Sequence, residues 1–376
     1  MNSEKNNETN SKSGIVKLIV FGALFFGMLV IFSAMMTPTK WFDDKRIQNR
    51  NARTVQMMEQ PPYTIDIINI GDSLSTAGFT PMELWRQNGF TSFNIGSDGI
   101  RMPEAYYAIV ESCNRQAPKY LLMESLFMFR YSATQDFQML LSQPLYHRFA
   151  FLKYHSIWKP FIEGRGVMIY HRGYTVNENV GGYEGDPEYL DLDLEGNDRV
   201  EVPAFNRMWF QRIKKFCAEK GIKIIIYSMP SPANYNWDRI EGLEKFAEEE
   251  GVEYLDLNQR AAEIGIDWEW DTNDGGDHMN LTGATKVAAF MGKYLSSKED
   301  LTDYRGDPAY QDWDEEIVEY DRLVKEMEGK SFQDIKDEQI KQKKEERREQ
   351  KNLNSNSSKT ETEAQGVLLK GSFKRG

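Results

Sequence analysis

The chain has 376 residues, 40% of them hydrophobic and 28% charged, which is enough apolar material for a large folded domain and excludes a wholly disordered chain. The net charge of −12 repels nucleic-acid phosphates, so we expect no nucleic-acid partner. Two cysteines exclude a disulfide scaffold, and four histidines without a helical ligand spacing do not indicate a metal site, so we expect no metal and no cofactor.

The N-terminal region contains an uncharged apolar run, Leu18–Met36. As a helix this run spans roughly 28 Å, close to the thickness of a bilayer core. It ends in Phe-Ser-Ala-Met-Met-Thr-Pro, a poor match to the small-residue cleavage site of a signal peptide, so we favour an uncleaved anchor. Lysines flank both sides, and the orientation therefore rests on the position of the single span near the N-terminus. We predict a cytoplasmic tail (1–13), a transmembrane anchor (14–36), a linker (37–61) and an extracellular domain at the cell membrane.

Residues 62–300 alternate between strand-like and helix-like segments. The predicted strands are Thr64–Ile70, Thr91–Ile95, Tyr120–Met123, Ile222–Tyr227 and Val252–Leu257. The predicted helices are Pro81–Gln87, Pro103–Asn114, Phe205–Lys220, Ile240–Glu250 and Leu281–Tyr294. This alternation predicts an α/β domain, with a parallel sheet between two layers of helices.

An insertion over residues 131–197 follows the third predicted strand and lacks the pattern of a core strand or helix. It is rich in aromatic residues with polar residues between them, a composition that suits the faces of sugars. Long insertions at this place can become lids over an active site. The alternative is that the aromatic residues form a small separate core.

The C-terminal end differs in composition from the domain. Residues 301–350 are dominated by charged side chains and predict a solvated helical segment, which should add little to the stability of the domain. Residues 351–376 are of low complexity and predict a disordered tail.

The ends of the predicted strands carry the residues of chemical interest. The first strand runs into Gly71-Asp72-Ser73, the second into Asn94-Ile95-Gly96, and Asp274 to His278 follow the fifth. In parallel sheets such ends lie on one edge, where ligands bind. A serine hydroxyl becomes a nucleophile when an imidazole accepts its proton, and a carboxylate orients that imidazole. Glycine amides can approach a developing oxyanion closely. Each block alone could be an ordinary turn or helix cap, and it is their order along the chain that predicts a serine hydrolase site.

These blocks resemble the SGNH/GDSL hydrolase family over about residues 62–298. Gly71–Ser75 match its first block, Gly96 its second, and Asp274 to His278 its last. The segments 229–232, 255–258 and 277–284 look closest to a membrane-anchored branch of this family, which is found near membrane-bound O-acyltransferases. That branch serves the modification of bacterial envelope polymers. The resemblance implies a flavodoxin-like parallel sheet, Ser73 as nucleophile, His278 as base, and no cofactor.

The sequence departs from the family pattern at two places. The third block, Gly-x-Asn-Asp, supplies an oxyanion donor, but here the third strand ends Met123-Glu124-Ser125. The amides of Ser73 and Gly96 remain as donors, with Asn94 as a substitute. The family's acid precedes the histidine by three residues, where this chain has Gly275. Asp274 and Asp277 are the candidates, and we favour Asp274 because the two glycines would let it fold back onto His278.

The predicted function is that of a cell-surface acyl esterase or transferase. The resemblance implies an O-acetylated envelope polysaccharide or another acylated sugar as substrate, and a membrane-bound O-acyltransferase as a partner. The alternative from another class is a non-catalytic accessory protein that binds the glycan or the acyltransferase during polysaccharide O-acetylation.

Overall fold

The computed structural model describes residues 2–36, 50–155, 171–194 and 200–331, and, further on, 333–335, 337, 338, 341 and 344; for residues 2–13 it describes the backbone alone. Two compact units are present, residues 1–324 and 325–376. The predicted tail 351–376 and parts of the predicted linker and insertion, 37–49, 156–170 and 195–197, lie outside the described residues.

Five parallel strands form the sheet of the first unit, in the order β2-β1-β3-β4-β5. The strands are β1 (Ile67–Ile70), β2 (Ser92–Asn94), β3 (Tyr120–Glu124), β4 (Lys223–Ser228) and β5 (Glu253–Asp256). Strand β1 lies between β2 and β3, so the chain changes direction across the sheet at β1, and in such sheets ligands bind at this point. The predicted parallel α/β sheet is confirmed.

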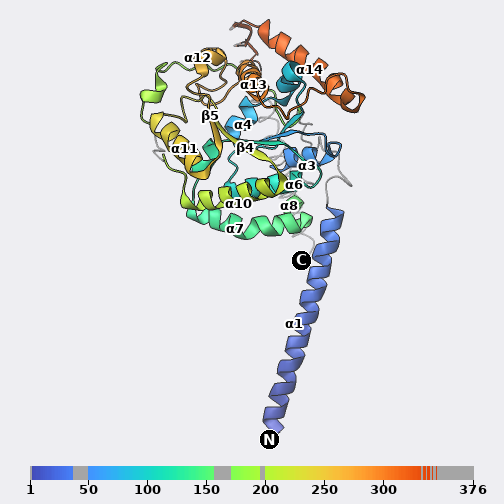
Figure 1. Cartoon of the computed structure of the whole chain (residues 1–376). Coiled ribbons are helices and arrows are strands. Elements are labelled where there is room, and N and C mark those ends of the chain that lie inside the picture. Colours follow the sequence, from blue (N-terminus) through green and yellow to red (C-terminus); the bar gives the residue numbers. More distant parts are fainter. Residues whose placement is uncertain are drawn as a thin grey trace, which may run out of the picture. The chain divides into compact units, whose positions relative to one another are not determined.

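Helices cover both faces of the sheet. On one face α13 (Leu281–Leu295) packs against α4 (Ser73–Gly78) and α5 (Pro81–Asn88). On the other, α10 (Ala204–Lys220) packs against α6 (Met102–Ser112), and α11 (Trp237–Glu250) joins it through a contact between Phe210 and Phe246. The layers are visible in Figure 1, where α13 and α10 lie on opposite sides of the strands. The shorter helices are α3 (Ala52–Glu59), which packs on α6, and α12 (Ala261–Ile264).

The insertion contains helices that the sequence analysis did not predict, although only Asp136 of the longer one is buried. After the short turn η2 (Leu126–Phe129), helix α7 (Ala133–Arg148) packs against α6, and α8 (Ala150–Tyr154) follows it. A short turn, η3 (Tyr189–Asp191), lies near the end of the insertion. Helix α7 contains Pro144 and carries apolar residues on both sides, which hides the helical period in the sequence.

The prediction that the domain ends at residue 300 and is followed by a solvated helix is wrong. The turn η4 (Pro308–Tyr310) leads into α14 (Gln311–Glu328), whose Trp313 is only 1% exposed and whose Tyr320 is fully buried. The ring of Trp313 lies 5.2 Å from that of Trp85, measured between centroids. The first unit therefore extends through this helix as far as Val324. The charged residues of its outer face outnumber the four buried residues of its inner face, so the sequence pattern alone predicts a solvated helix.

Arg172, from the insertion, connects three separate segments of the chain. Its backbone has a φ of 50°, and its carbonyl accepts a hydrogen bond of 2.9 Å from the backbone N–H of Asn94 in β2. Its guanidinium forms ion pairs of 2.8 Å with Asp312 and Glu316 and lies 4.2 Å from the ring centre of Trp313. The insertion thus ties the edge of the sheet to α14.

The N-terminal helix α1 (Asn2–Met35) includes the apolar stretch Gly14–Met35, which is long and apolar enough to cross a membrane. None of its most apolar part is buried in the protein, and a signal sequence would share these properties. The stretch coincides with the predicted anchor.

Candidate active site

The turn between β1 and α4 holds Ser73 at the edge of the sheet. Asp72 caps α4, because its carboxylate accepts a hydrogen bond of 3.2 Å from the backbone N–H of Leu74. The turn passes close to β3, since a Cβ added to Gly71 would lie 2.6 Å from the Cβ atoms of Glu124 and Ser75. Ser73 is the first residue of α4 and is partly exposed, so its backbone N–H has no acceptor within the helix.

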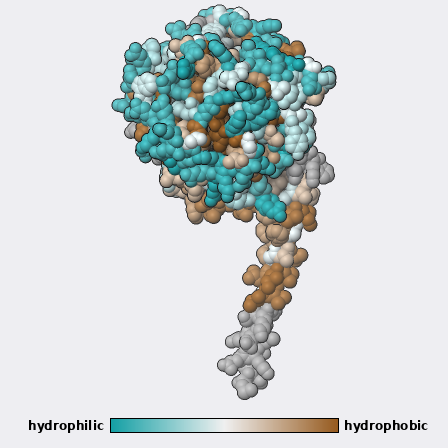
Figure 2. All heavy atoms as spheres, in the orientation of Figure 1, coloured by the Kyte–Doolittle hydropathy of each residue, from teal (hydrophilic) through white to brown (hydrophobic). Residues whose placement is uncertain are grey.

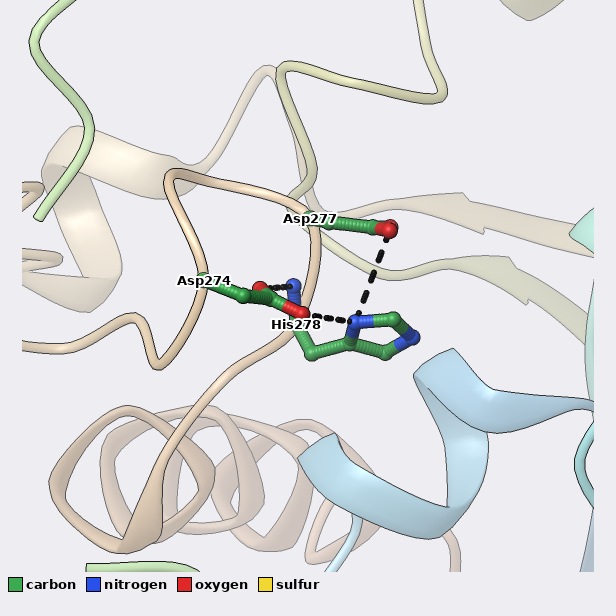
Figure 3. Close-up of side chains that lie close together, drawn as sticks. All are labelled: Asp274, Asp277 and His278. Atoms are coloured by element: carbon green, nitrogen blue, oxygen red, sulfur yellow. Dashed lines mark hydrogen bonds and ion pairs between the residues drawn. The ribbon is translucent and has the colours of Figure 1, made fainter. Parts of the chain in front are cut away.

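The loop before α13 brings an aspartate and a histidine together. The imidazole Nδ1 of His278 lies 2.6 Å from Oδ2 of Asp274, whose Oδ1 accepts the backbone N–H of His278 at 2.8 Å. Gly275 and Gly276 make this fold-back possible, because their φ angles of 80° and 91° are unfavourable for other residues. Asp277 is the more distant carboxylate, 3.5 Å from Nδ1, and its other oxygen accepts the amide of Asn234 at 2.5 Å. Figure 3 shows both carboxylates on the same side of the imidazole.

The acidic surroundings change the protonation of the imidazole. Burial alone would lower the pKa of His278, but the hydrogen bond with Asp274 and the charges of Asp277, Asp274 and Asp72 outweigh it and raise the pKa above 6.5. For Asp274, burial opposes ionisation, but the hydrogen bonds with His278 prevail and lower its pKa. This is the electrostatic pattern of a base that a carboxylate orients and stabilises when protonated.

The histidine and the serine lie on the same edge of the sheet. Asp72, the neighbour of Ser73, is close enough for its charge to act on His278. In Figure 3 the second ring nitrogen of His278 points away from the carboxylates, toward the light blue ribbon, the colour of the segment that carries α4. Among the described residues, no hydrogen bond joins Ser73 Oγ to the imidazole. Such bonds are often long without substrate and shorten in the reacting complex.

The structure does not present Asn94 and Gly96 as oxyanion donors. The amide of Asn94 donates to the carbonyls of Ser75 and Phe79, at 2.8 and 3.2 Å, and its oxygen accepts the backbone N–H of Gly96 at 3.0 Å. Both groups are therefore already bound to protein atoms, and the amide of Asn94 ties Ser75 of α4 and its C-cap Phe79 to the end of β2. Of the three oxyanion donors expected from the sequence, the backbone N–H of Ser73 remains.

A buried polar network beneath the turn was not anticipated from the sequence. Glu124, at the end of β3, is fully buried and accepts hydrogen bonds from the hydroxyl of Tyr235 at 2.6 Å and from the N–H of Leu126. Burial, and next the charge of Asp72, raise the pKa of Glu124 to about 8. Glu124 occupies the place where the family carries its third block, so the missing asparagine was the signal that could have drawn attention to it.

Arg130 is a second residue that the sequence did not reveal. It follows η2, and its Nε donates a hydrogen bond of 2.8 Å to Oδ2 of Asp72. Burial nevertheless raises the pKa of Asp72. The side chain of Arg130 is 40% exposed, so a cation stands at the rim of the turn that carries Ser73.

Part of the insertion braces the histidine loop. The N–H of Gly181 donates to the carbonyl of Thr272 at 2.9 Å, and the N–H of Gly275 donates to the carbonyl of Gly181 at 2.8 Å. The ring of Tyr183 lies so close to Gly276 that an added Cβ there would meet it at 2.9 Å. The position of Asp274 thus depends on the insertion as well as on the two glycines.

One group of three side chains in the described part of the chain could also hold a cation. Asp274, Asp277 and His278 offer ligand atoms that lie within 4.8 Å of one another. Both oxygens of Asp274 are already bound to His278, through Nδ1 and the backbone N–H, so a cation would have to displace the proton on Nδ1. The existing contacts fit the carboxylate-imidazole pair better than a metal centre.

The two aspartates should differ sharply in their importance. We expect Asp274→Asn to lower kcat by about 10³ to 10⁴, because an amide would favour the wrong imidazole tautomer. Asp277→Asn should lower it less than about tenfold, since this carboxylate lies 3.5 Å from Nδ1. Steady-state hydrolysis of an aryl acetate measures both variants. The reverse order would transfer the role to Asp277, and two small losses would indicate a serine-histidine pair.

Several solved structures are similar to the chain, and three of them are described here. No family model and no curated protein matches the chain. The structures are a predicted acylhydrolase from Bacteroides fragilis, a predicted GDSL-like lipase from Parabacteroides merdae and a GDSL-like lipase from Bacteroides thetaiotaomicron. Their sequence identities are 12%, 13% and 10%, and their TM-scores are 0.33, 0.33 and 0.29. The matches cover 64%, 63% and 61% of this chain and 93%, 97% and 87% of the respective structures.

Proposed function

We propose that the chain is a serine-dependent acyl-ester hydrolase or acyltransferase. The observation that carries this proposal is the 2.6 Å contact between Asp274 and His278, on the sheet edge where Ser73 begins α4. A histidine held by a carboxylate beside a partly exposed serine at a strand-to-helix turn is the arrangement that acyl transfer requires.

The proposed reaction has two halves. Ser73 Oγ attacks the ester carbonyl carbon while His278 Nε2 accepts the hydroxyl proton, and the backbone N–H of Ser73 faces the oxyanion. The ester C–O bond then breaks, and His278 returns the proton to the departing alcohol. Water, or a sugar hydroxyl, next attacks the acyl-enzyme with His278 again as base, and Ser73 is restored.

The proposed substrate is an O-acetylated envelope polysaccharide or another acylated sugar. A cavity of about 740 Å³ at the end of the insertion is lined by the aromatic side chains of Tyr189, Trp237 and Trp268 together with polar groups such as Asn258. Ser73 and His278 are not among its lining residues, so the support it gives concerns the binding of a sugar and not the ester group. Aromatic walls with a few placed polar groups are typical of small-molecule sites. In this proposal α1 anchors the chain in the cell membrane with the domain outside, and a membrane-bound O-acyltransferase is the partner.

An accessory role without turnover is the second candidate. The observation that favours it is that Asn94 and Gly96 are engaged elsewhere, which leaves the oxyanion with fewer donors than the family provides. In that case the same edge would bind the glycan or the acyltransferase.

A serine-directed fluorophosphonate probe tests the enzyme proposal without knowledge of the substrate. We expect it to label the wild type at Ser73, as located by mass spectrometry, and not Ser73→Ala. The labelling rate should fall as the pH is lowered, because protonated His278 cannot act as base. The pH at which the rate is half of its maximum should lie above 6.5, because the pKa of His278 is raised. If the wild type is not labelled at any pH while it still binds an acetylated glycan, the accessory role replaces the enzyme.

A further inference from the structure

Helix α7 presents an exposed apolar stripe. Phe137, Leu141 and Leu145 have relative exposures of 59%, 57% and 49%, and they recur every four residues. Successive members of such a stripe turn by only about 40° around the helix, so the three side chains lie on one face. In Figure 2 tan and brown atoms gather along the edge of the domain where Figure 1 draws α7.

Polar contacts at both ends of α7 determine which face points outward. Near its start, Asp136 accepts a hydrogen bond of 2.9 Å from Arg101, beside α6, and near its end His147 Nδ1 lies 3.2 Å from Glu111 of α6. Asp136 and His147 are separated by three helical turns and lie within about 20° of each other around the helix axis. The stripe is centred roughly 130° away from them, so the domain cannot cover it by a rotation of α7 without breaking both contacts.

The segment that directly follows α7 touches the apolar N-terminal helix. The ring of Phe149 lies 5.9 Å from that of Phe26, and the ring of Phe151 lies 5.6 Å from that of Phe32, measured between centroids. The backbone N–H of Phe151 also donates a hydrogen bond of 3.3 Å to Ser33 Oγ. Helix α8 therefore runs beside the C-terminal half of the stretch Gly14–Met35.

These contacts set the depth of α7 if α1 crosses a bilayer. Phe26 precedes Met35 by nine residues, or roughly 13 Å along the helix, and the whole apolar stretch only slightly exceeds a bilayer core of about 30 Å. Phe149 then lies below the edge of the hydrocarbon, and α7, whose last residue is the neighbouring Arg148, meets the bilayer at this end. Because α7 meets the bilayer at this end and carries an exposed apolar stripe, it can lie in the membrane interface with the stripe toward the lipids.

We propose that α7 lies in the outer bilayer surface, with Phe137, Leu141 and Leu145 inserted among the lipids beside α1. The proposal rests on the proposed anchoring through α1, and it adds a second, in-plane contact to the single span. Two contacts restrict rotation of the domain about its anchor. The edge of the sheet that carries Ser73 is thereby held at a constant orientation to the membrane.

Fluorescence quenching in bilayers tests this with the full chain. A bimane label is placed at Leu141→Cys, and the chain is reconstituted in nanodiscs of phosphatidylethanolamine and phosphatidylglycerol that contain lipids spin-labelled near the headgroup. The native thiols react poorly, because burial raises the pKa of Cys113 to about 11 and that of Cys217 to about 12. We expect the spin label to reduce the fluorescence at position 141 at least about twofold.

Two matched positions make the result decisive. Val318→Cys, on α14, is a 69% exposed aliphatic position on another helix and should not be quenched. Leu24→Cys, within α1, should be quenched by lipids labelled deep in their chains. If Leu24 is quenched and Leu141 is not, α7 does not enter the bilayer although the anchor holds, and another part of the chain or a second copy covers the stripe. If Leu24 is not quenched either, the anchoring itself is wrong.

Discussion

Ser73→Ala and His278→Ala are each expected to lower kcat for hydrolysis of an aryl acetate by about 10⁴ to 10⁶, and the double variant should be no worse than either single one. The reason is that the two side chains act as one unit: a serine without a base and a base without a nucleophile are about equally ineffective. Both residues lie at the surface edge of the sheet, so the thermal transition should change little. Steady-state kinetics with the purified full chain measures the effect.

Two variants of the same chemical type serve as controls. Ser297→Ala removes an exposed hydroxyl, and His155→Ala removes an exposed imidazole whose Nδ1 lies 2.8 Å from the carbonyl oxygen of Leu152. Both should retain full activity. Additive losses in the Ser73 and His278 double variant would contradict a shared mechanism, and so would wild-type activity in Ser73→Ala.

Trp313→Ala is expected to destabilise the domain by about 3 to 5 kcal/mol, the usual cost of removing a buried tryptophan. Its side chain is 1% exposed and packs on Trp85, and Arg172 lies over its ring. Since domains are stabilised by about 5 to 15 kcal/mol in total, truncation after Asp300, which also removes Tyr310 and Tyr320, should prevent folding. Thermal unfolding of the full chain in micelles, followed by near-UV circular dichroism, measures the shift, about 10 °C for the point variant.

Val318→Ala is the matched control for this prediction, because it lies on the same helix but is 69% exposed, and it should cost less than about 0.5 kcal/mol. Deletion of residues 351–376 should also leave the transition unchanged, as their composition predicts. A domain that keeps its transition after truncation at Asp300 would restore the boundary that the sequence favours.

The sheet could be predicted from the sequence because each strand is a short apolar run with a turn residue or a helix after it. The segment Ile222–Tyr227 is the clearest example, and it corresponds to β4. Helix α7 and the burial of α14, whose helical character the composition does predict, could not be predicted with the same success. In α7 apolar residues occur on both sides and a proline interrupts the pattern, and in α14 the many charges outweigh a few large buried aromatics.

Some features of the candidate site could likewise be predicted from the sequence and others could not. The fold-back of Asp274 onto His278 could be anticipated, because it depends on two adjacent glycines in a short loop. The engagement of Asn94 and Gly96 could not, because it depends on how closely α4 packs on β2. Glu124 and Arg130 reach Asp72 or its surroundings from another strand and another loop, and such long-range partners leave no local pattern.

The contacts of Arg172 also bear on the time course of folding during synthesis. Its acidic partners, Asp312 and Glu316, are synthesised about 140 residues after it, and its carbonyl pairs with Asn94, made long before. Chains emerge from the N-terminus first, so the turn that carries Ser73 and the strand β2 are synthesised while α14 is still missing. Closure of the domain must therefore wait for α14, and until then the apolar surface around Trp85 is available to chaperones and to aggregation.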